Sequence, residues 1–195
     1  MRSAQLTRRT LETEITGNLI LDGNGEANIR TGVGFFDHML ILLTRHAGLT
    51  LDLQADGDLQ VDCHHTVEDV GIVLGQLIAH AAGDKRGIRR YGDATVPMDE
   101  ALLQSAIDFS GRPYLVFKAE FQSDQVGDFE TQMTEEFFRA VAFNAGMTLH
   151  LSCLYGKNDH HMIEGLFKAF ARSLKIALSI DPENPDAILS TKGAL

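Results

Sequence analysis

Arg45-His46-Ala47-Gly48-Leu49-Thr50-Leu51 is the stretch that decides the fold, because it returns later in the chain as Phe143-Asn144-Ala145-Gly146-Met147-Thr148-Leu149. In both copies a helix-like segment ends at a glycine, and a segment typical of a half-buried strand follows. The two copies are offset by 143 − 45 = 98 positions. The sequence therefore predicts that one structural unit occurs twice.

A second repeated motif supports the duplication. His64-His65-Thr66-Val67-Glu68 recurs as His160-His161-Met162-Ile163-Glu164, at an offset of 160 − 64 = 96. The second unit is therefore two residues shorter between these features. Each half is predicted to contain strands, a helix, one or two further strands and a helix that opens with a histidine doublet.

The expected fold class is α+β, an internally duplicated unit with two sheets, each with helices packed on one side. We expect a single domain made of two pseudo-repeats, at about residues 6–92 and 93–180, and a tail at 181–195. Pro182 and Pro185 favour loop structure in that tail. The order in which the strands pair does not follow from the sequence.

Residues 6–21 alternate only partly and are predicted to form one strand. Asp22-Gly23-Asn24-Gly25 is a strong hairpin signal, so residues 27–31 are expected to return as the partner strand. The other expected elements are strands at 49–53, 59–62, 95–98, 102–109, 114–121 and 147–154, and helices at 35–47, 64–82, 134–144 and 159–178.

The composition is that of a globular protein, with 44% hydrophobic and 23% charged residues. A net charge of −10 argues against nucleic acid and anionic membrane surfaces as partners. No apolar run approaches the roughly 20 residues of a membrane span, and the N-terminus lacks the apolar core of a signal peptide. Two cysteines make no disulfide framework, so a cytoplasmic location is expected.

The histidine doublets predict metal sites. Neighbouring residues on a helix diverge by about 100°, so His64 and His65 cannot easily chelate one ion together. Glu68 stands at i+4 from His64 and i+3 from His65, within reach of the same helical face as either. We therefore expect two sites, with each doublet sending one histidine to each.

The duplication extends the ligand set, because the offset of 98 places Glu136 at the position that corresponds to His38. Nitrogen and oxygen ligands without thiolate suit Mn, Fe or Zn, and carboxylate-bearing sites with open positions favour Mn or Fe. The candidate ligands are His38, His64, His65, Glu68, Glu136, His160, His161 and Glu164.

Structural roles compete with these assignments. A lone histidine is more often a satisfied core or surface group than a ligand, but two such motifs on a duplicated frame favour metal binding. His46 lies eight residues after His38, about two helical turns, and is expected to face the same cleft. Cys63 adjoins the first doublet, yet Asp159 takes that place before the second, so a buried inert thiol is its favoured role.

These motifs resemble the imidazoleglycerol-phosphate dehydratase family of histidine biosynthesis, over nearly the whole chain. The length leaves no room for the phosphatase fused to some members, so the monofunctional form is expected, with halves of the ribosomal protein S5 domain 2-like kind. The matching motifs are Arg9-Thr10-Leu11-Glu12-Thr13, Gly34-Phe35-Phe36-Asp37-His38-Met39-Leu40, Asp62-Cys63-His64-His65-Thr66-Val67-Glu68-Asp69, Arg89-Arg90-Tyr91-Gly92, Pro97-Met98-Asp99-Glu100, Asp108-Phe109-Ser110-Gly111-Arg112-Pro113, Asn158-Asp159-His160-His161 through Phe167-Lys168, and Ser190-Thr191-Lys192-Gly193.

The resemblance implies dehydration of D-erythro-imidazoleglycerol phosphate to imidazoleacetol phosphate, with two Mn²⁺ per subunit that bind the substrate as imidazolate. Many members have histidine where this chain has Glu136, which departs from the family pattern. The implied ligands are His38, His65, His160 and Glu164 for one metal, and His64, Glu68, His161 and Glu136 for the other.

The resemblance also assigns substrate contacts. Glu12 matches a substrate-contacting glutamate and is expected to act as an acid or base. The predicted catalytic residues are Glu12 and three of the metal ligands, His65, Glu68 and Glu164. The predicted substrate-binding residues are Glu12, His38, His46, Arg90, Arg112, Lys168, Ser190 and Lys192, of which the cationic side chains and Ser190 match phosphate contacts.

Family assemblies have twenty-four subunits with metal sites between protomers, and the same homo-oligomer is expected here. Two other function classes compete: a metal-binding or storage assembly without catalysis, and a two-metal hydrolase. Storage has no use for cationic phosphate-matching residues such as Arg112, and the hydrolase reading lacks a His-Glu-x-x-His helix.

Overall fold

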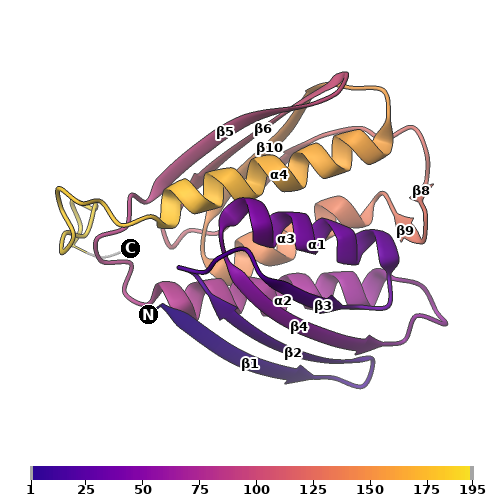
Figure 1. The fold of residues 1–195 in the computed structure, drawn as a ribbon, viewed down its shortest axis with the longest axis horizontal. Helices are drawn as coiled ribbons and strands as arrows, with labels where there is room; N and C mark the ends of the chain where they lie inside the picture. Colours follow the sequence, from indigo (N-terminus) through magenta and orange to yellow (C-terminus); the bar gives the residue numbers. More distant parts are fainter. Residues whose placement is uncertain (1, 194–195) are drawn as a thin grey trace.

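Two four-stranded sheets enclose four helices in the structure, a computed structural model that describes residues 2–193 (Figure 1). The helices are α1 (Gly34–Ala47), α2 (His64–Ala82), α3 (Met133–Ala145) and α4 (Asp159–Leu178). The strands are β1 (Ser3–Arg9), β2 (Thr13–Ile20), β3 (Ala27–Arg30), β4 (Thr50–Gly57), β5 (Tyr91–Met98), β6 (Ala101–Asp108), β7 (Tyr114–Lys118), β8 (Gln125–Val126), β9 (Phe129–Glu130) and β10 (Thr148–Tyr155).

The two large sheets have the same topology, in the orders β1-β2-β4-β3 and β5-β6-β10-β7. In each sheet the first three strands are antiparallel, and the last strand runs parallel to its neighbour. Each half therefore runs through the same sequence of elements: hairpin, strand, helix, strand, helix. This confirms the predicted α+β fold and the duplication behind it.

Both repeated glycines have the role that the sequence predicts. Gly48 and Gly146 follow α1 and α3 in the left-handed conformation, with φ values of 71° and 67°. Glycine adopts this conformation with little strain because it has no Cβ, and many helices therefore end at a glycine. The strands β4 and β10 start two residues later.

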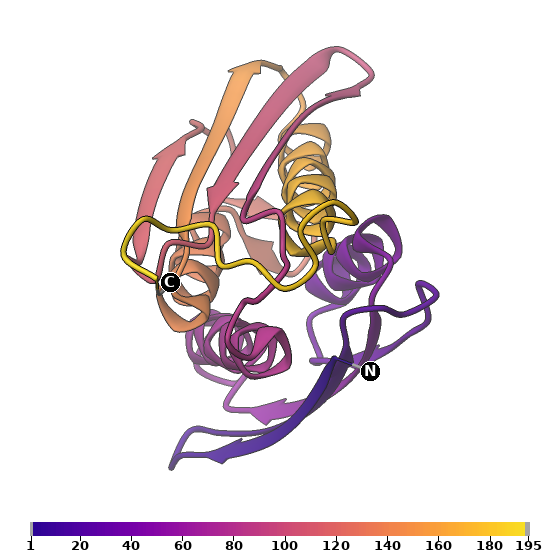
Figure 2. The same cartoon turned by 90° about the vertical axis from the view of Figure 1, so that its left-hand side faces the viewer.

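The helices pack across the boundary between the halves. α1 of the first half lies against α4 of the second, and α2 of the first lies against α3 of the second. The four helices thus form a double layer between the sheets, with α2 on the first sheet and α4 on the second (Figure 2). The core between α1, α3 and α4 is aromatic, and its buried rings include Phe36, Phe129, Phe137, Phe138, Phe167 and Phe170.

Three strand predictions are wrong. Residues 6–21 form two strands, because the Thr10 hydroxyl accepts the N–H groups of Glu12 and Thr13 and turns the chain there. Residues 27–30 do not pair with that segment: β3 pairs in parallel with β4 at the far edge of the sheet. Residues 59–62 form a turn, since the N–H groups of Leu59 and Val61 bond back to Gly57 and Asp58.

The short hairpin of β8 and β9 had no counterpart in the sequence prediction. The loop after β7, predicted as the end of a strand to 121, instead leads into this hairpin. The tail from 181 to 193 lacks helix and strand, as expected, and residues 194–195 of the predicted tail lie outside the described residues. Between residues 2 and 193, no helix combines the length and the apolar character that a membrane crossing needs.

Changing Gly75 to Ala should destabilise the protein. A Cβ at this position in α2 would lie 2.7 Å from both the Val141 carbonyl oxygen and the Asn144 Cβ of α3. Gly→Ala in an open helix adds up to about 1 kcal/mol of stability. We expect the clash to reverse that sign and cost about 1–3 kcal/mol in urea unfolding. A gain in stability would show that the two helices are less closely packed.

The Arg2–Asp22 ion pair predicts a pH-dependent contribution to stability. Arg2 also donates to the Leu178 carbonyl oxygen at 2.6 Å, which joins the first strand to the end of α4. The hydrogen bond from Arg2 holds the pKa of Asp22 below its ordinary value of 3.8. The contribution is therefore present above that value and is lost as the pH falls through the lowered pKa.

Asp22→Asn should therefore lower the free energy of unfolding by at most about 1 kcal/mol at neutral pH, because the pair is largely exposed. The difference from the parent protein should shrink as the pH falls below about 4. Denaturant unfolding of both proteins between pH 3 and 7 measures it. A difference that is constant over this range would assign the effect to something other than the ion pair.

Candidate metal centre and anion pocket

His38, His160 and Glu164 form a cluster where α1 meets α4. The Nε2 atoms of His38 and His160 lie 3.5 and 3.1 Å from the same carboxylate oxygen of Glu164. Among residues 2–193 this is the group of three whose ligand atoms all lie within 4.8 Å of one another. Ligands of one ion with bonds of about 2.1 Å are themselves about 3.0–3.5 Å apart. The cluster therefore fits a divalent cation.

Helix termini set the position of this cluster. Asp128 caps α1, because its carboxylate accepts the N–H groups of Gly34 at 2.7 Å and Phe35 at 3.1 Å. The Phe35 ring then meets His160 edge to face at 5.0 Å. Asn158 caps α4 and accepts the N–H of His161 at 3.3 Å. Both histidine doublets lie in the first turns of their helices, as the sequence predicts.

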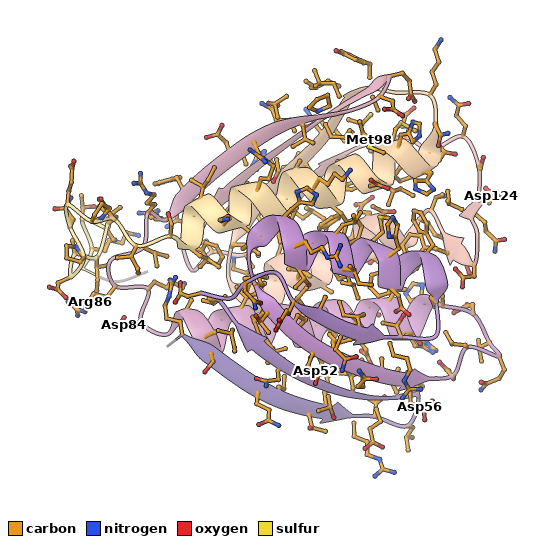
Figure 3. All side chains as sticks on the ribbon, in the orientation of Figure 1. Asp52, Asp56, Asp84, Arg86, Met98 and Asp124 are labelled. Carbon is orange, nitrogen blue, oxygen red and sulfur yellow. The ribbon has the colours of Figure 1, made fainter. Side chains whose placement is uncertain are left out.

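The Glu164 carboxylate is kept ionised although it is buried. Burial raises the pKa of Glu164, but the Lys168 ammonium at 2.6 Å and the neighbouring His160 together lower it by more. The net pKa therefore lies below the ordinary value. A charged carboxylate between two imidazoles is the donor set that Mn, Fe and Zn prefer. Lys168 also contacts the sulfur of Met98 at 3.4 Å. Met98, labelled in Figure 3, ends the edge strand β5 of the second sheet.

The second predicted ligand set is not assembled in the same way. His64 Nε2 lies 3.8 Å from the carboxylate of Glu68, the partner predicted from the i+4 spacing. Glu136 belongs to α3, the helix that packs on α2, but its two carboxylate oxygens bind Arg139 at 2.6 and 2.8 Å. Arg139 also binds Glu135. In this structure Glu136 is therefore engaged in an ion pair.

The second histidine of each doublet points elsewhere. The two rings of each doublet are inclined at 75° and 82° to each other, with centroids 6.1 Å apart. His65 Nδ1 lies 3.0 Å from Asp58, and its Nε2 lies 3.8 Å from Glu12. His161 Nδ1 lies 2.8 Å from Glu100, and its Nε2 lies 3.7 Å from Asp99.

These carboxylates shift the pKa values of the two histidines. The hydrogen bond with Asp58 raises the pKa of His65, and the hydrogen bond with Glu100 raises that of His161. In return His161, together with the backbone N–H of Asn158, lowers the pKa of Glu100 to about 2. Glu100 is thus fully ionised at neutral pH.

Four of the five residues predicted to bind phosphate gather at the opposite end of α4, and the fifth, Lys168, lies instead beside Glu164. Arg90, Arg112, Ser190 and Lys192 line a pocket of about 830 Å³ beside the C-terminal tail. Arg90 is fixed there: it binds the carboxylate of Asp108 through two nitrogens, at 2.6 and 3.2 Å, and donates to the Leu189 carbonyl. The cationic pocket stands out in a chain of net charge −10.

The pocket and the metal cluster are far apart within one chain. The Arg90 N–H donates to the Ala177 carbonyl at 3.0 Å, which places the pocket at the C-terminal end of α4. His160 lies 17 residues earlier on the same helix, about 25 Å away at 1.5 Å per residue. Lys168 and His46 lie between the metal cluster and the pocket. Burial is the main cause that lowers the pKa of His46, and the charges of Lys168 and Arg172 lower it further.

The sequence reasoning missed several acidic residues that hold the candidate site residues in place. Asp58 binds His65, Asp108 binds Arg90, and Asp128 caps the helix of His38. Glu100 had been noticed only as part of a motif, without a role. No local pattern signals these contacts, because each joins residues from different elements.

Comparison with known proteins identifies the chain's relatives. The profile of the family described as imidazoleglycerol-phosphate dehydratase matches residues 31–174. The imidazoleglycerol-phosphate dehydratase of Acetivibrio thermocellus is 57% identical over 194 residues, which cover 100% of this chain and 99% of the relative. The protein of that name from an Exiguobacterium species is 58% identical, over 99% of this chain and 98% of the relative.

Solved structures agree. The crystal structure of imidazoleglycerol-phosphate dehydratase from Staphylococcus aureus has a TM-score of 0.84 and 45% identity, over 92% of this chain and 99% of the other. The structure of the Pyrococcus furiosus protein has a TM-score of 0.83 and 30% identity, over 97% of this chain and 100% of the other.

Proposed function

Because the chain belongs to the imidazoleglycerol-phosphate dehydratase family and is a hydro-lyase of histidine biosynthesis, we propose that it dehydrates D-erythro-imidazoleglycerol phosphate at sites that hold two Mn²⁺ per subunit and lie between protomers. The observation that carries this proposal is the convergence of His38 and His160 on the buried carboxylate of Glu164.

The proposed ligand sets combine the groups seen in the structure with those that the family resemblance implies. His38, His160 and Glu164 hold one ion, and His65 completes the set from another protomer. His64 and Glu68 hold the second ion with Glu136, once that carboxylate leaves Arg139, and His161 of another protomer completes it. When bound, the metals would supply Lewis acids that favour the imidazolate form of the substrate ring and loss of its hydroxyl group.

The chain's own residues move the protons. Dehydration breaks the C–O bond next to the ring and a C–H bond on the neighbouring carbon, and the resulting enol becomes the ketone. Glu12, in the turn between β1 and β2, lies 3.8 Å from His65 Nε2 and is half exposed, so a bound substrate can reach it. We assign Glu12 as the acid or base that exchanges these protons.

The phosphate end of the substrate fits the pocket beside the tail. Arg112 and Lys192 supply positive charge, and Ser190 supplies a hydroxyl. Asp108 and the Leu189 carbonyl orient Arg90, so its guanidinium is already held when the phosphate arrives. This cationic pocket also argues against a storage function, which needs no phosphate site.

The separation of the two subsites supports a homo-oligomer. In the substrate a short carbon chain joins the ring to the phosphate. The distance between them is far less than the roughly 25 Å that separates His160 from the pocket within one protomer. The two subsites can act on one substrate only if different protomers supply them. This agrees with the proposed twenty-four-subunit assembly.

The proposed location is the cytoplasm. Cys63 and Cys153 are both free thiols, and burial raises the pKa of each. Free thiols with raised pKa values persist in a reducing compartment. The substrate class, a small phosphate ester of amino-acid biosynthesis, favours the same compartment.

Glu12→Gln tests the acid/base assignment. The substitution should leave two Mn²⁺ per subunit in place and lower kcat by about 10²–10⁴-fold, because proton transfer is lost while the metals and the phosphate pocket remain. Release of imidazoleacetol phosphate measures turnover, and elemental analysis measures the metal. Turnover equal to that of the parent protein would remove Glu12 from the mechanism.

Mixed assemblies test whether sites are shared. His65→Ala and His160→Ala subunits should each be inactive alone, but together they should recover about a quarter of the parent activity. In an equal mixture, half of the subunits supply an intact His160, and half of their neighbours supply an intact His65. A shared site needs both residues, so one site in four is complete.

The matched control mixes His65→Ala with Glu68→Ala, which damage the same side of the site and should give no recovery. Sites built within one chain predict no recovery in either mixture. Chelation of the parent assembly should abolish activity, and Mn²⁺ should restore it; a protein that binds Mn²⁺ yet never dehydrates the substrate would contradict the proposed function itself.

A further inference from the structure

Each second histidine of a doublet has a carboxylate on its Nδ1 atom. Asp58, directly after β4, lies 3.0 Å from Nδ1 of His65. Glu100, in the turn between β5 and β6, lies 2.8 Å from Nδ1 of His161. The first histidines differ, because the Nε2 atoms of His64 and His160 face glutamates of their own helices.

We propose that Asp58 and Glu100 are positioning residues that fix the tautomer of His65 and His161, so that Nε2 of each ring is the atom presented to a metal ion. An ionised carboxylate only accepts hydrogen bonds, so Nδ1 must carry the proton. A neutral imidazole has one N–H, which leaves the Nε2 lone pair free for the ion. This inference rests on the proposed two-metal function.

The duplication did not copy this arrangement from one half to the other. Asp58 follows β4, and the equivalent position in the second half, at the offset of 98, is Gly156, which has no side chain to contribute. Glu100 comes from a hairpin turn instead. The two halves therefore reach the same contact from non-equivalent positions, which indicates that the contact is needed for the histidine rather than inherited with the fold.

Backbone N–H groups hold the Glu100 carboxylate in place, whereas Asp58 is held by burial. The other carboxylate oxygen of Glu100, Oε1, accepts the backbone N–H groups of Lys157 at 3.1 Å and Asn158 at 2.8 Å. The β5–β6 turn is thereby fastened to the start of α4. Asp58 is mostly buried, with 17% of its side chain exposed, and its Oδ1 meets no hydrogen-bond partner among residues 2–193.

Glutamine at position 100 separates positioning from a purely structural role. In Glu100→Gln the side-chain carbonyl can still accept the two backbone N–H groups, so the turn stays fastened. The amide NH₂ then stands where Oε2 stood and donates to Nδ1, which forces the His161 proton onto Nε2. The metal-binding atom is blocked while the fold is preserved.

The experiment titrates metal-free assemblies with Mn²⁺ and follows free Mn²⁺ by its electron paramagnetic resonance signal. The parent protein should bind two Mn²⁺ per subunit. Glu100→Gln should weaken one of the two by about 10–100-fold, the usual effect of losing such a partner. Asp58→Ala, which removes the acceptor of the Nδ1 proton, should do the same to the other. Glu26→Gln, at an exposed carboxylate with no described side-chain hydrogen bond, should bind like the parent.

Thermal unfolding of the metal-free proteins shows that the weakening is not a loss of fold. Parent-like Mn²⁺ binding by Glu100→Gln would overturn the inference while leaving the two-metal function standing. A parent protein that binds no Mn²⁺ would instead overturn the proposed function. If Glu100→Gln does not fold, Asp58→Ala decides, because the only described side-chain hydrogen bond of Asp58 is to His65. Unchanged Mn²⁺ binding by that variant overturns the inference equally.

Discussion

The packing of α1 against α4, across the boundary between the halves, is the contact on which the rest of the site depends. It brings His38 from the first half to His160 and Glu164 from the second. α2 packs on α3 in the same way, and these helices carry His64 and Glu136 from opposite halves. The cluster of three thus draws on both halves. The duplicated fold therefore assembles the candidate metal cluster, because each half supplies part of it.

The same helices separate the two places at which the proposed function puts the ring and the phosphate of one substrate. The metal cluster lies at the N-terminal end of α4 and the cationic pocket at its C-terminal end. A rigid helix of this length keeps the ring subsite and the phosphate subsite of one chain apart. Under the proposed function, association of protomers would complete the site, and the cationic pocket would receive the phosphate.

Local signals predicted the helices well and the strands less well. Both doublet helices, their starting turns and the capping glycines Gly48 and Gly146 lie where the sequence places them. The turn at residues 10–12 was missed because it uses a threonine hydroxyl instead of glycine or proline. The pairing of β3 with β4 was missed because a hairpin signal predicts pairing only between segments joined by one turn. A parallel partner depends on the arrangement of the whole sheet.

The sequence by itself determined the duplication, the fold class and the family, because repeated motifs and their spacing are properties of the chain order. It also named the residue types that suit a metal and a phosphate. Only the tertiary structure decided which of them meet: His38 joins His160 and Glu164, Glu136 turns to Arg139, and Glu100 holds His161. The physical reason is that a hydrogen bond or a shared ligand position depends on distances of about 3 Å, which helix packing sets and sequence separation does not.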